Sequence, residues 1–416
     1  MGFSRTSLIA IGAALIGIAP VAAAAEEEVG LKPVRVEDRE YRFDSAEQHG
    51  VAVRVIARGL SHGYSMAFLP GGDALVVERG VRLRLLRGAT SDAPRLLADA
   101  IAGVPDYSKQ EHVHPDDVLG IQDVALHPDF ARNGLIYFTN NKPITFDAKA
   151  GRLKSSLVLV RARLDGTRLT DMAEIMTGAP EVGIGGSRIQ FSRDGLVYVS
   201  VGGLSTGDDA SSQRLDTIYG KVLRLNADGT PAAGNPFAGR KDARPEILTY
   251  GHRDPLGLGI EPRTGALFAS EHGPQGGDEL NRILPGRNYG WPTSTYGNQY
   301  GGSPLPQAPV AAGTEGPTMV WLPAIAPSGI AFYTGDRFPG WKNSLFIASA
   351  RRGQVNGTGG IIRVVLNDRM EELRQEVLLD SLHQRFKDVR QGPDGLLYAL
   401  TDEDAAVVVR ISPAAD

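Results

Sequence analysis

The stretch from Tyr250 to Trp291, YGHRDPLGLGIEPRTGALFASEHGPQGGDELNRILPGRNYGW, is dense in residues that could bind a ligand. Its polar side chains lie among glycine and proline: Glu271, His272, Asp278, Glu279 and Asn281 surround Gly273, Pro274, Gly276 and Gly277. Glycine and proline hold a backbone in tight shapes that leave carbonyl oxygens free to face a ligand. Carboxylates and carbonyls together favour calcium over a transition metal, and the nearby Arg253 could bind a planar multi-anion with both arms of its guanidinium. The alternative from composition alone is an acidic, glycine-rich surface loop.

A second group of possible ligands is weaker. His112 and His114 are two residues apart, so both would face one side of a strand, and Asp116 and Asp117 follow them. Such a group could hold a transition metal, but it lacks a definite third ligand.

The elements that must position these residues repeat along the chain. A turn rich in Pro, Asp and Gly, followed by four or five strand-type apolar residues, occurs six times at intervals of 52 to 78 residues. The turn residues are Gly72, Gly134, Gly195, Gly265, Asn343 and Gly395. Each interval has room for about four short strands, which predicts an all-β fold, a six-bladed β-propeller. The alternative is a pair of β-sandwiches, and one stretch, Met370–Leu379, has a doubtful helical period.

Two strand-like stretches at opposite ends of the chain, Val51–Ala57 and Ala405–Ile411, predict how the ring closes. Pairing them in one blade would remove exposed strand edges. Two long segments interrupt the repeats, Ala102–Gly120 and Pro292–Pro317, and we expect both to surround the mouth of the propeller.

The N-terminus predicts export. Residues 1–25 have a charged start at Arg5, an apolar run from Leu8 to Ile18 and small residues up to Ala25, which is the pattern of a secretory signal peptide. We therefore expect cleavage near Ala25, a linker at residues 26–48, a propeller at residues 49–416 and a periplasmic or secreted protein. No later stretch is apolar enough to span a membrane.

Composition narrows the class of partner. The formal net charge of −4 becomes about −5 without the signal peptide, which argues against nucleic acid as the main partner. The chain has no cysteine, so stability must come from its core rather than from disulfides.

Several motifs resemble one known family. The runs GHRDPLGL, SEHGPQGGDELN and NYGWP occur in order within about forty residues, and GKVLRLN, AGTEGP, APSGIAFY and RFKDVRQGPDGLLYALTDE extend the similarity over essentially all of the mature chain. They resemble the aldose sugar dehydrogenases that depend on pyrroloquinoline quinone (PQQ), the glucose/sorbosone dehydrogenase family. The resemblance implies hydride abstraction from C1 of an aldose to give a lactone, with PQQ and Ca²⁺ as cofactors, and it leaves the sugar and the electron acceptor open.

The resemblance also implies binding residues. Arg253 and Arg385 match cofactor arginines of the family, while Arg351 and Lys387 stand at two further cationic positions. PQQ carries three carboxylates, so four cations would suit it. Matches to calcium positions are Gly273 and Pro274 for the calcium of the cofactor, and Glu279 and Tyr289 for a further calcium found in some members.

The sequence departs from the family at the catalytic position. Relatives carry a histidine base four residues before the arginine that corresponds to Arg188, and here that position is Ile184. The asparagine usual after the cofactor arginine is Asp254, and a usual glutamine is replaced near Val118. The candidates for a relocated base are Asp254 beside the cofactor arginine and a histidine of the long second-blade loop, His112 or His114, of which we expect His114.

These departures leave three functions open. The first is a PQQ- and calcium-dependent aldose dehydrogenase with impaired or altered catalysis. The second is a propeller that binds a sugar or a cell-wall fragment without oxidising it. The third is a calcium-assisted hydrolase of the lactonase type.

Overall fold

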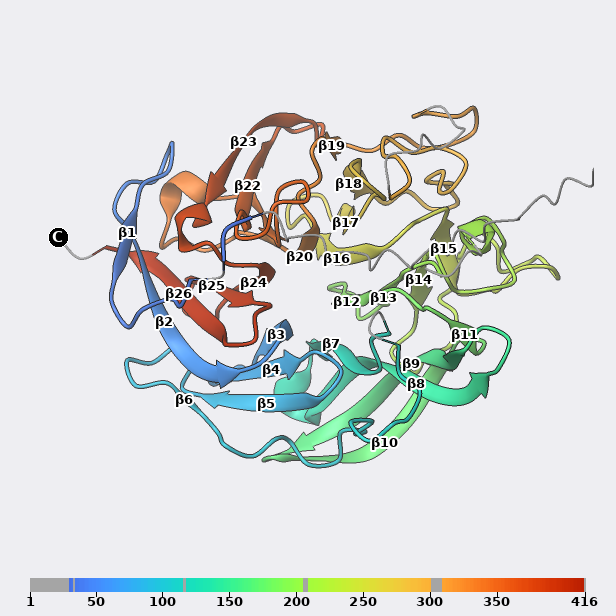
Figure 1. Ribbon diagram of the computed structural model, residues 1–416, viewed down its shortest axis with the longest axis horizontal. Coiled ribbons are helices and arrows are strands. Elements are labelled where there is room, and N and C mark those ends of the chain that lie inside the picture. The colour runs from blue at the N-terminus through green and yellow to red at the C-terminus, as the bar shows by residue number, and fades with distance from the viewer. Residues whose placement is uncertain (1–29, 33, 115–116, 205–208, 301–308, 415–416) are drawn as a thin grey trace, which may run out of the picture.

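The structure is a computed structural model that describes residues 30–414 except 33, 115–116, 205–208 and 301–308. Six antiparallel sheets are arranged in a ring around one centre (Figure 1). The predicted six-bladed β-propeller and its all-β class are therefore confirmed. The described helices are short: α1 (Phe130–Asn133) and the 3-10 helices η1 (Asp209–Ser212), η2 (Pro339–Trp341) and η3 (Asp380–Leu382). The expected signal peptide at residues 1–25, with its cleavage near Ala25, lies outside the described residues.

The first three blades follow one another in chain order. Blade one contains β3 (Gly63–Phe68), β4 (Ala74–Glu78), β5 (Arg82–Arg87) and β6 (Arg95–Leu96). Blade two contains β7 (Gly120–Leu126), β8 (Leu135–Asp147), β9 (Arg152–Asp165) and β10 (Arg168–Thr177), with β11 (Glu181–Val182) paired to β9. Blade three contains β12 (Ser187–Phe191), β13 (Val197–Val201), β14 (Lys221–Leu225) and β15 (Ile247–Tyr250).

The last three blades repeat this order, and the sixth also takes strands from the N-terminus. Blade four contains β16 (Pro255–Ile260), β17 (Leu267–Glu271), β18 (Asp278–Arg282) and β19 (Met319–Trp321). Blade five contains β20 (Pro327–Phe332), β21 (Leu345–Ser349), β22 (Gly360–Leu366) and β23 (Glu372–Leu378). Blade six contains β24 (Phe386–Gln391), β25 (Leu397–Thr401), β26 (Ala406–Pro413), β2 (Val51–Leu60) and β1 (Tyr41–Phe43).

The six predicted turns all lie between the first and second strands of a blade. Their central residues have φ between 63° and 85°, at Gly72, Gly134, Gly195, Gly265, Asn343 and Gly395. Glycine adopts this left-handed conformation without strain, and asparagine tolerates it better than most residues. The repeat found in the sequence is thus the inner hairpin of each blade.

The ring closes as the sequence predicts. Strand β2 pairs antiparallel with β26, with Val53 opposite Ile411 and Val55 opposite Val409. The blue N-terminal strand therefore lies beside the red C-terminal strands in Figure 1. Joining the two ends of the chain in one sheet leaves no open seam between the first and last blades.

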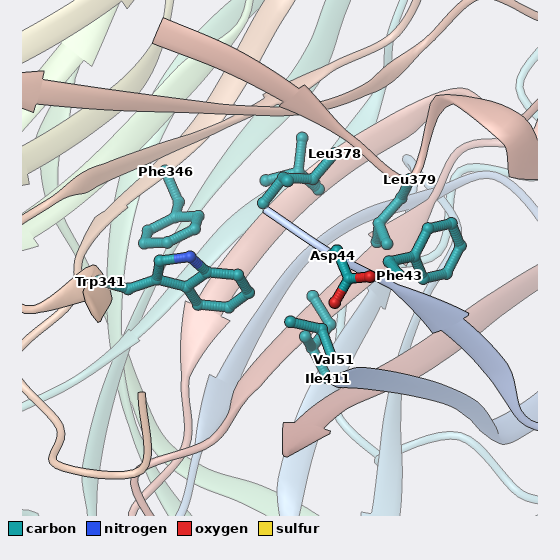
Figure 2. A pocket seen from close by; sticks show the side chains of 9 residues that line it. Phe43, Asp44, Val51, Trp341, Phe346, Leu378, Leu379 and Ile411 are labelled. Atoms are coloured by element: carbon teal, nitrogen blue, oxygen red, sulfur yellow. The ribbon is translucent and has the colours of Figure 1, made fainter. Parts of the chain in front are cut away.

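The segment predicted as a linker, residues 26–48, contributes to the ring. Tyr41–Phe43 forms β1 along the outer edge of β2, and Trp341 Nε1 donates a hydrogen bond to Ser45 Oγ at 2.8 Å. Figure 2 shows the apolar junction that this segment helps to cover, with Phe43, Val51, Trp341, Phe346, Leu378 and Ile411 around a small cavity. Three residues are too few for a recognisable period, so the sequence gives no sign of β1.

The doubtful helical stretch, Met370–Leu379, is not helical. It contains β23, whose residues 372 to 375 are exposed on the outer edge of blade five. An edge strand with many charged residues discourages pairing with other chains, and such a strand lacks the alternation that would mark it in the sequence.

Arg188 of β12 occupies the centre of the ring and is buried. Its guanidinium donates hydrogen bonds to all five other innermost strands: to Leu256 O (2.6 Å), Tyr64 O (3.0 Å), Ser328 Oγ (3.1 Å), Lys387 O (3.1 Å) and Asp123 Oδ1 (3.3 Å). One side chain therefore ties all six blades together where a tunnel would otherwise run.

Candidate cofactor and metal site

One face of the ring collects the residues that precede the innermost strands. The first strand of each blade is innermost, and these strands contact one another around the centre in the order β3, β7, β12, β16, β20 and β24. Because every blade repeats the same order of antiparallel strands, the innermost strands run in one direction. Ile184, Asp254 and Arg385, which precede β12, β16 and β24, therefore lie on the same face.

A cavity of about 760 Å³ opens on this face. Its walls include Ile184 from blade three, Arg253 and Asp254 before β16, and Pro274 from the glycine-rich loop. Tyr300, in one of the two long segments predicted to surround the mouth, also lines it, and so does Val118 in the other. This volume is in the usual range for pockets that bind small molecules.

Of the four predicted cofactor cations, Arg253 is the one that lines this cavity, whose wall also includes Arg152. Its backbone N–H donates to Glu271 Oε2 at 2.9 Å, and Nη1 donates to the carbonyl of His272 at 3.1 Å. The guanidinium carbon lies 5.3 Å from the ring centre of Trp291 and 6.0 Å from that of Tyr300. Aromatic faces stabilise a cation and leave its N–H groups for an anion, so Arg253 is held ready for a planar, charged ligand.

Three cations from three blades surround His272. Burial, together with the charges of Lys387, Arg253 and Arg351, lowers the pKa of His272 to about 3. Lys387 lies in β24, and Arg351 follows β21. Residues that are distant from His272 in the sequence therefore act on its imidazole. The His272 ring is therefore neutral at physiological pH, and the positive charge around it comes from the three cations.

Arg385 lies at the same face but beside blade six carboxylates. The backbone N–H of Arg385 donates to Glu403 Oε1 at 2.9 Å. Burial raises the pKa of Asp402, but the charge of Arg385 is among those that lower it overall. Arg351, Arg385 and Lys387 do not line the 760 Å³ cavity. The structure thus brings all four cations to one face, with Arg253 alone in the cavity wall.

The glycine-rich loop joins β17 to β18 and is fixed by Asp278. The Asp278 carboxylate accepts N–H bonds from Gly273 (2.8 Å) and from Ile325 and Ala326 (both 2.7 Å). A Cβ at Gly273 would come within 2.2 Å of the Gly276 carbonyl, so this position requires glycine. Backbone carbonyls are consequently packed close together in a loop that spans blades four and five.

Two buried carboxylates meet behind this loop. Asn281 Nδ2 donates to Glu271 Oε1 at 2.6 Å and to Glu279 Oε2 at 3.0 Å, while Asn281 Oδ1 is buried without a partner among the described residues. Burial and the neighbouring Glu271 raise the pKa of Glu279 to about 8. Within the described part of the chain Glu279 has no cationic partner, so a bound cation would compensate this charge.

Sequence comparison places this site in a known context. The sequence model of the glucose/sorbosone dehydrogenase family matches residues 60–410, which is most of the chain. The chain belongs to the glucose/sorbosone dehydrogenase family. The match begins at the end of β2 and continues into β26, so it contains blades one to five and most of the C-terminal strands of blade six.

Individual members of the glucose/sorbosone dehydrogenase family show the same similarity. The aldose sugar dehydrogenase YliI of Escherichia coli is 35% identical over 369 residues, covering 87% of this chain and 93% of YliI. The apo structure of the soluble aldose sugar dehydrogenase from Escherichia coli superimposes with a TM-score of 0.76 at 32% identity, covering 87% of this chain and 99% of that one. The PQQ-bound aldose sugar dehydrogenase from Streptomyces coelicolor gives a TM-score of 0.65 at 26% identity, covering 87% and 98%.

Tyr289, which the sequence predicts as a ligand of a further calcium, has a side chain that is bonded within the protein. The Tyr289 hydroxyl donates to the carbonyl of Arg282 and accepts the Leu284 N–H, and the ring stacks on His252 with centroids 4.5 Å apart. The side chain is therefore fully used inside the protein. A metal could take only the backbone carbonyl of Tyr289.

The histidines of the second-blade loop lie away from the cavity. His112 and His114 are exposed, and His112 stacks on Phe146 with ring centroids 4.5 Å apart. Asp116 lies outside the described residues, and Asp117 pairs with Arg152. No cluster of three or more His, Asp or Glu side chains suited to a metal occurs in the described ranges.

Ile184 lies at the cavity wall where the family resemblance implies a histidine. It is 7% exposed, packs in the core shared by blades two and three, and forms an isolated bridge with Leu204. An aliphatic side chain at this position cannot accept a proton.

Sequence reasoning missed three glycines that shape the cavity floor. A Cβ at Gly185 or Gly202 would come within 2.7 or 2.4 Å of Asp254 Oδ1, and a Cβ at Gly186 would overlap Leu256. The doubled glycines in GIGGSR and VGGL were the available signal, because paired glycines often mark a close approach of backbone to a functional group.

Proposed function

We propose that this chain is exported and oxidises the C1 hydroxyl of aldoses to lactones, with PQQ and calcium as cofactors. The observation that carries this proposal is the position of Arg253 in the cavity wall, beside Pro274 of the carbonyl-rich loop. A cation and a set of hard oxygen ligands next to one small-molecule cavity suit a multi-anionic quinone with its calcium. The similarity to YliI and to the PQQ-bound enzyme of Streptomyces coelicolor supports the same function.

The residues present fit the proposed cofactors. Arg253 would bind a PQQ carboxylate, and Arg351, Arg385 and Lys387 would offset the remaining negative charge from neighbouring blades. Asp254, next to Arg253, would lie against the same ligand. The carbonyls of Gly273 and Pro274 would hold the calcium of the cofactor. Bound PQQ supplies an ortho-quinone that accepts a hydride.

A further calcium would occupy the space beside Glu279. A small void there is lined by Glu271, Glu279, Gly273 and Tyr289, among others. Glu279 and the Tyr289 carbonyl would be ligands, and the cation would compensate two carboxylates that are otherwise buried together.

Export is supported by the N-terminal sequence, with its charged start, apolar run and small residues before Glu26. No helix in the described part of the chain is long and apolar enough to cross a membrane. We therefore place the mature protein in the periplasm or outside the cell.

Reconstitution tests the proposed function. Purified protein is mixed with PQQ and calcium, bound quinone is followed by absorbance, and dye reduction is measured with a panel of aldoses. We expect binding of PQQ and dye reduction with at least one aldose. If the protein bound no PQQ either with or without calcium, the proposal would be rejected.

A sugar-binding propeller without oxidation is the second candidate, and Ile184 is the observation that favours it. It predicts sugar binding by calorimetry with no dye reduction in the presence of PQQ. Hydrolysis of a lactone without PQQ would instead identify a calcium-assisted lactonase.

Calcium is expected to raise the melting temperature of the purified protein, because a cation bound only by the folded state stabilises it. At a hundredfold excess over the dissociation constant the gain is about 2.7 kcal/mol per site. Differential scanning calorimetry with calcium or with a chelator measures the shift. An unchanged midpoint, with no metal found by elemental analysis, would contradict both calcium sites.

Glu279→Gln is the matched variant for the further calcium site. The pKa of Glu279 is about 8 in the folded, calcium-free protein, against about 4.3 in the unfolded chain. The stability that this bound proton contributes is therefore fully present below a pH of about 4.3 and is lost as the pH rises through about 8. Calcium should therefore raise the melting temperature more at pH 8 than at pH 6. Glu279→Gln should remove this pH dependence and raise the melting temperature of the calcium-free protein.

A further inference from the structure

The oxidation of a sugar at C1 needs a group that takes the hydroxyl proton, and Ile184 cannot do so. The question of which group replaces it rests on the proposed function. A base must lie in the cavity wall, must have an oxygen or nitrogen lone pair free and must keep that lone pair at the working pH.

Asp254 lies in the cavity wall together with Ile184. The two are joined through a short backbone segment, because Gly186 N–H, two residues after Ile184, donates to Asp254 Oδ1 at 2.9 Å. A carboxylate thus stands next to the position that the resemblance assigns to the missing histidine.

The glycine cradle around Asp254 is built for this carboxylate. A Cβ at Gly185 would lie 2.7 Å from Oδ1 and a Cβ at Gly202 would lie 2.4 Å from it, so any side chain at either position would displace the group. The backbone also fixes the residue from behind, since the Asp254 carbonyl accepts the His272 N–H at 3.1 Å. Among the described residues Oδ2 makes no hydrogen bond, which leaves one oxygen for a ligand.

Opposing electrostatic effects act on the pKa of Asp254. Burial raises its pKa, and so does Glu271, while Arg253, the Gly186 N–H and Lys387 oppose that rise. Tyr64 of β3 is the other titratable group near it, and the charge of Asp254 helps to raise the pKa of that phenol. A carboxylate with a raised pKa is a better proton acceptor than an ordinary aspartate.

Two histidines that could serve instead each lack one of the requirements. His114 is exposed and does not line the cavity, so it does not lie where a base would have to act. His272 has a buried Nε2 without a partner in the described residues, but a pKa of about 3 makes it a poor proton acceptor, and it lies beside the small void rather than the cavity.

We propose that Asp254 is the general base of this enzyme, in place of the histidine lost at position 184. As the C1–H bond breaks, bound PQQ would accept the hydride with its two electrons. As the O–H bond breaks, the proton goes to Asp254. The electron pair of the O–H bond becomes the second bond of a C1 carbonyl, so the aldose leaves as its lactone.

Asp254→Asn is the sharpest test, because asparagine has the same shape and its Oδ1 can still accept the Gly186 N–H. In the enzyme loaded with PQQ and calcium, we expect kcat to fall by about 10²- to 10⁴-fold, with KM little changed. PQQ binding, followed by absorbance, should change by less than about threefold, or ~0.6 kcal/mol.

The pH profile and two further variants separate catalysis from structure. Wild-type kcat/KM should fall as pH drops through the pKa of Asp254, and Asp254→Asn should lose this acidic limb. Ile184→His added to Asp254→Asn should restore activity by about tenfold or more, because it returns a base to the same wall. His114→Ala is the control and should leave kcat unchanged.

Three results would overturn the proposal in distinguishable ways. Asp254→Asn with wild-type kcat and an unchanged pH profile would show that another group is the base while the proposed function stands. A large loss of kcat in His114→Ala would move the role to the second-blade loop. A wild type that binds PQQ but oxidises no aldose would reject the proposed function itself, and the base with it.

Discussion

Arg253→Ala should weaken PQQ binding by about 2 to 5 kcal/mol, which is ~30-fold or more in the dissociation constant. The guanidinium lies in the cavity wall between Trp291 and Tyr300, and its backbone N–H and Nη1 hold Glu271 and the His272 carbonyl. Its loss would leave a ligand carboxylate in the cavity without its charged partner. Absorbance or fluorescence titration with PQQ at saturating calcium measures the change.

Four companion variants define what Arg253 contributes. Arg253→Lys keeps the charge but loses the planar fork, so its affinity should lie between those of wild type and alanine. Arg351→Ala and Arg385→Ala should have smaller effects, because neither side chain lines the cavity. Arg132→Ala, which removes a 78% exposed side chain on blade two, should leave binding unchanged. Equal losses in Arg132→Ala and Arg253→Ala would mean that only net charge matters.

The fold could be predicted because its signals are local. Each inner hairpin needs a turn residue with positive φ, and five glycines and Asn343 mark those positions in the sequence. Apolar strand residues follow each turn, so the count of repeats gives the count of blades. Ring closure followed from the same logic, since a propeller with free edges would be unstable.

The arrangement of the site depended on long-range contacts that no local pattern records. The four cations could be placed on one face once the ring was known, but only the structure shows Arg253 in the cavity wall and Arg385 beside Glu403. The pairing of Glu271 with Glu279 through Asn281 follows from their alternation in β17 and β18, which requires the strand register.

The position of His114, an outside candidate for the base, could not be read from the sequence for a related reason. Sequence spacing put His114 on a loop near the mouth, but that loop is long, and its ion pair between Asp117 and Arg152 cannot be inferred from composition. Asp254 was recognisable as a substitution for asparagine, whereas its nearness to Ile184 depends on the Gly186 N–H reaching across from blade three.

Arg188→Met should destabilise the folded ring by about 3 to 5 kcal/mol. Methionine keeps much of the buried volume but leaves Asp123, 3.3 Å from the guanidinium, with a buried charge that has lost its nearest partner. It also removes hydrogen bonds to backbone carbonyls of β3, β16 and β24 and to the Ser328 hydroxyl of β20. For a chain of this length the loss corresponds to roughly 5 °C in the melting temperature.

Calorimetry of wild type, Arg188→Met and Arg188→Lys decides how much of this stability comes from the shared guanidinium. Lysine keeps the charge near Asp123 but has one nitrogen, which cannot reach acceptors on five strands, so Arg188→Lys should fall between the other two. Because Lys387 O and Leu256 O are among the acceptors, the strands that carry the cofactor cations should also loosen, and PQQ retention should fall together with the melting temperature. A variant that melts like wild type and still retains PQQ would show that the blades hold their positions without the central arginine.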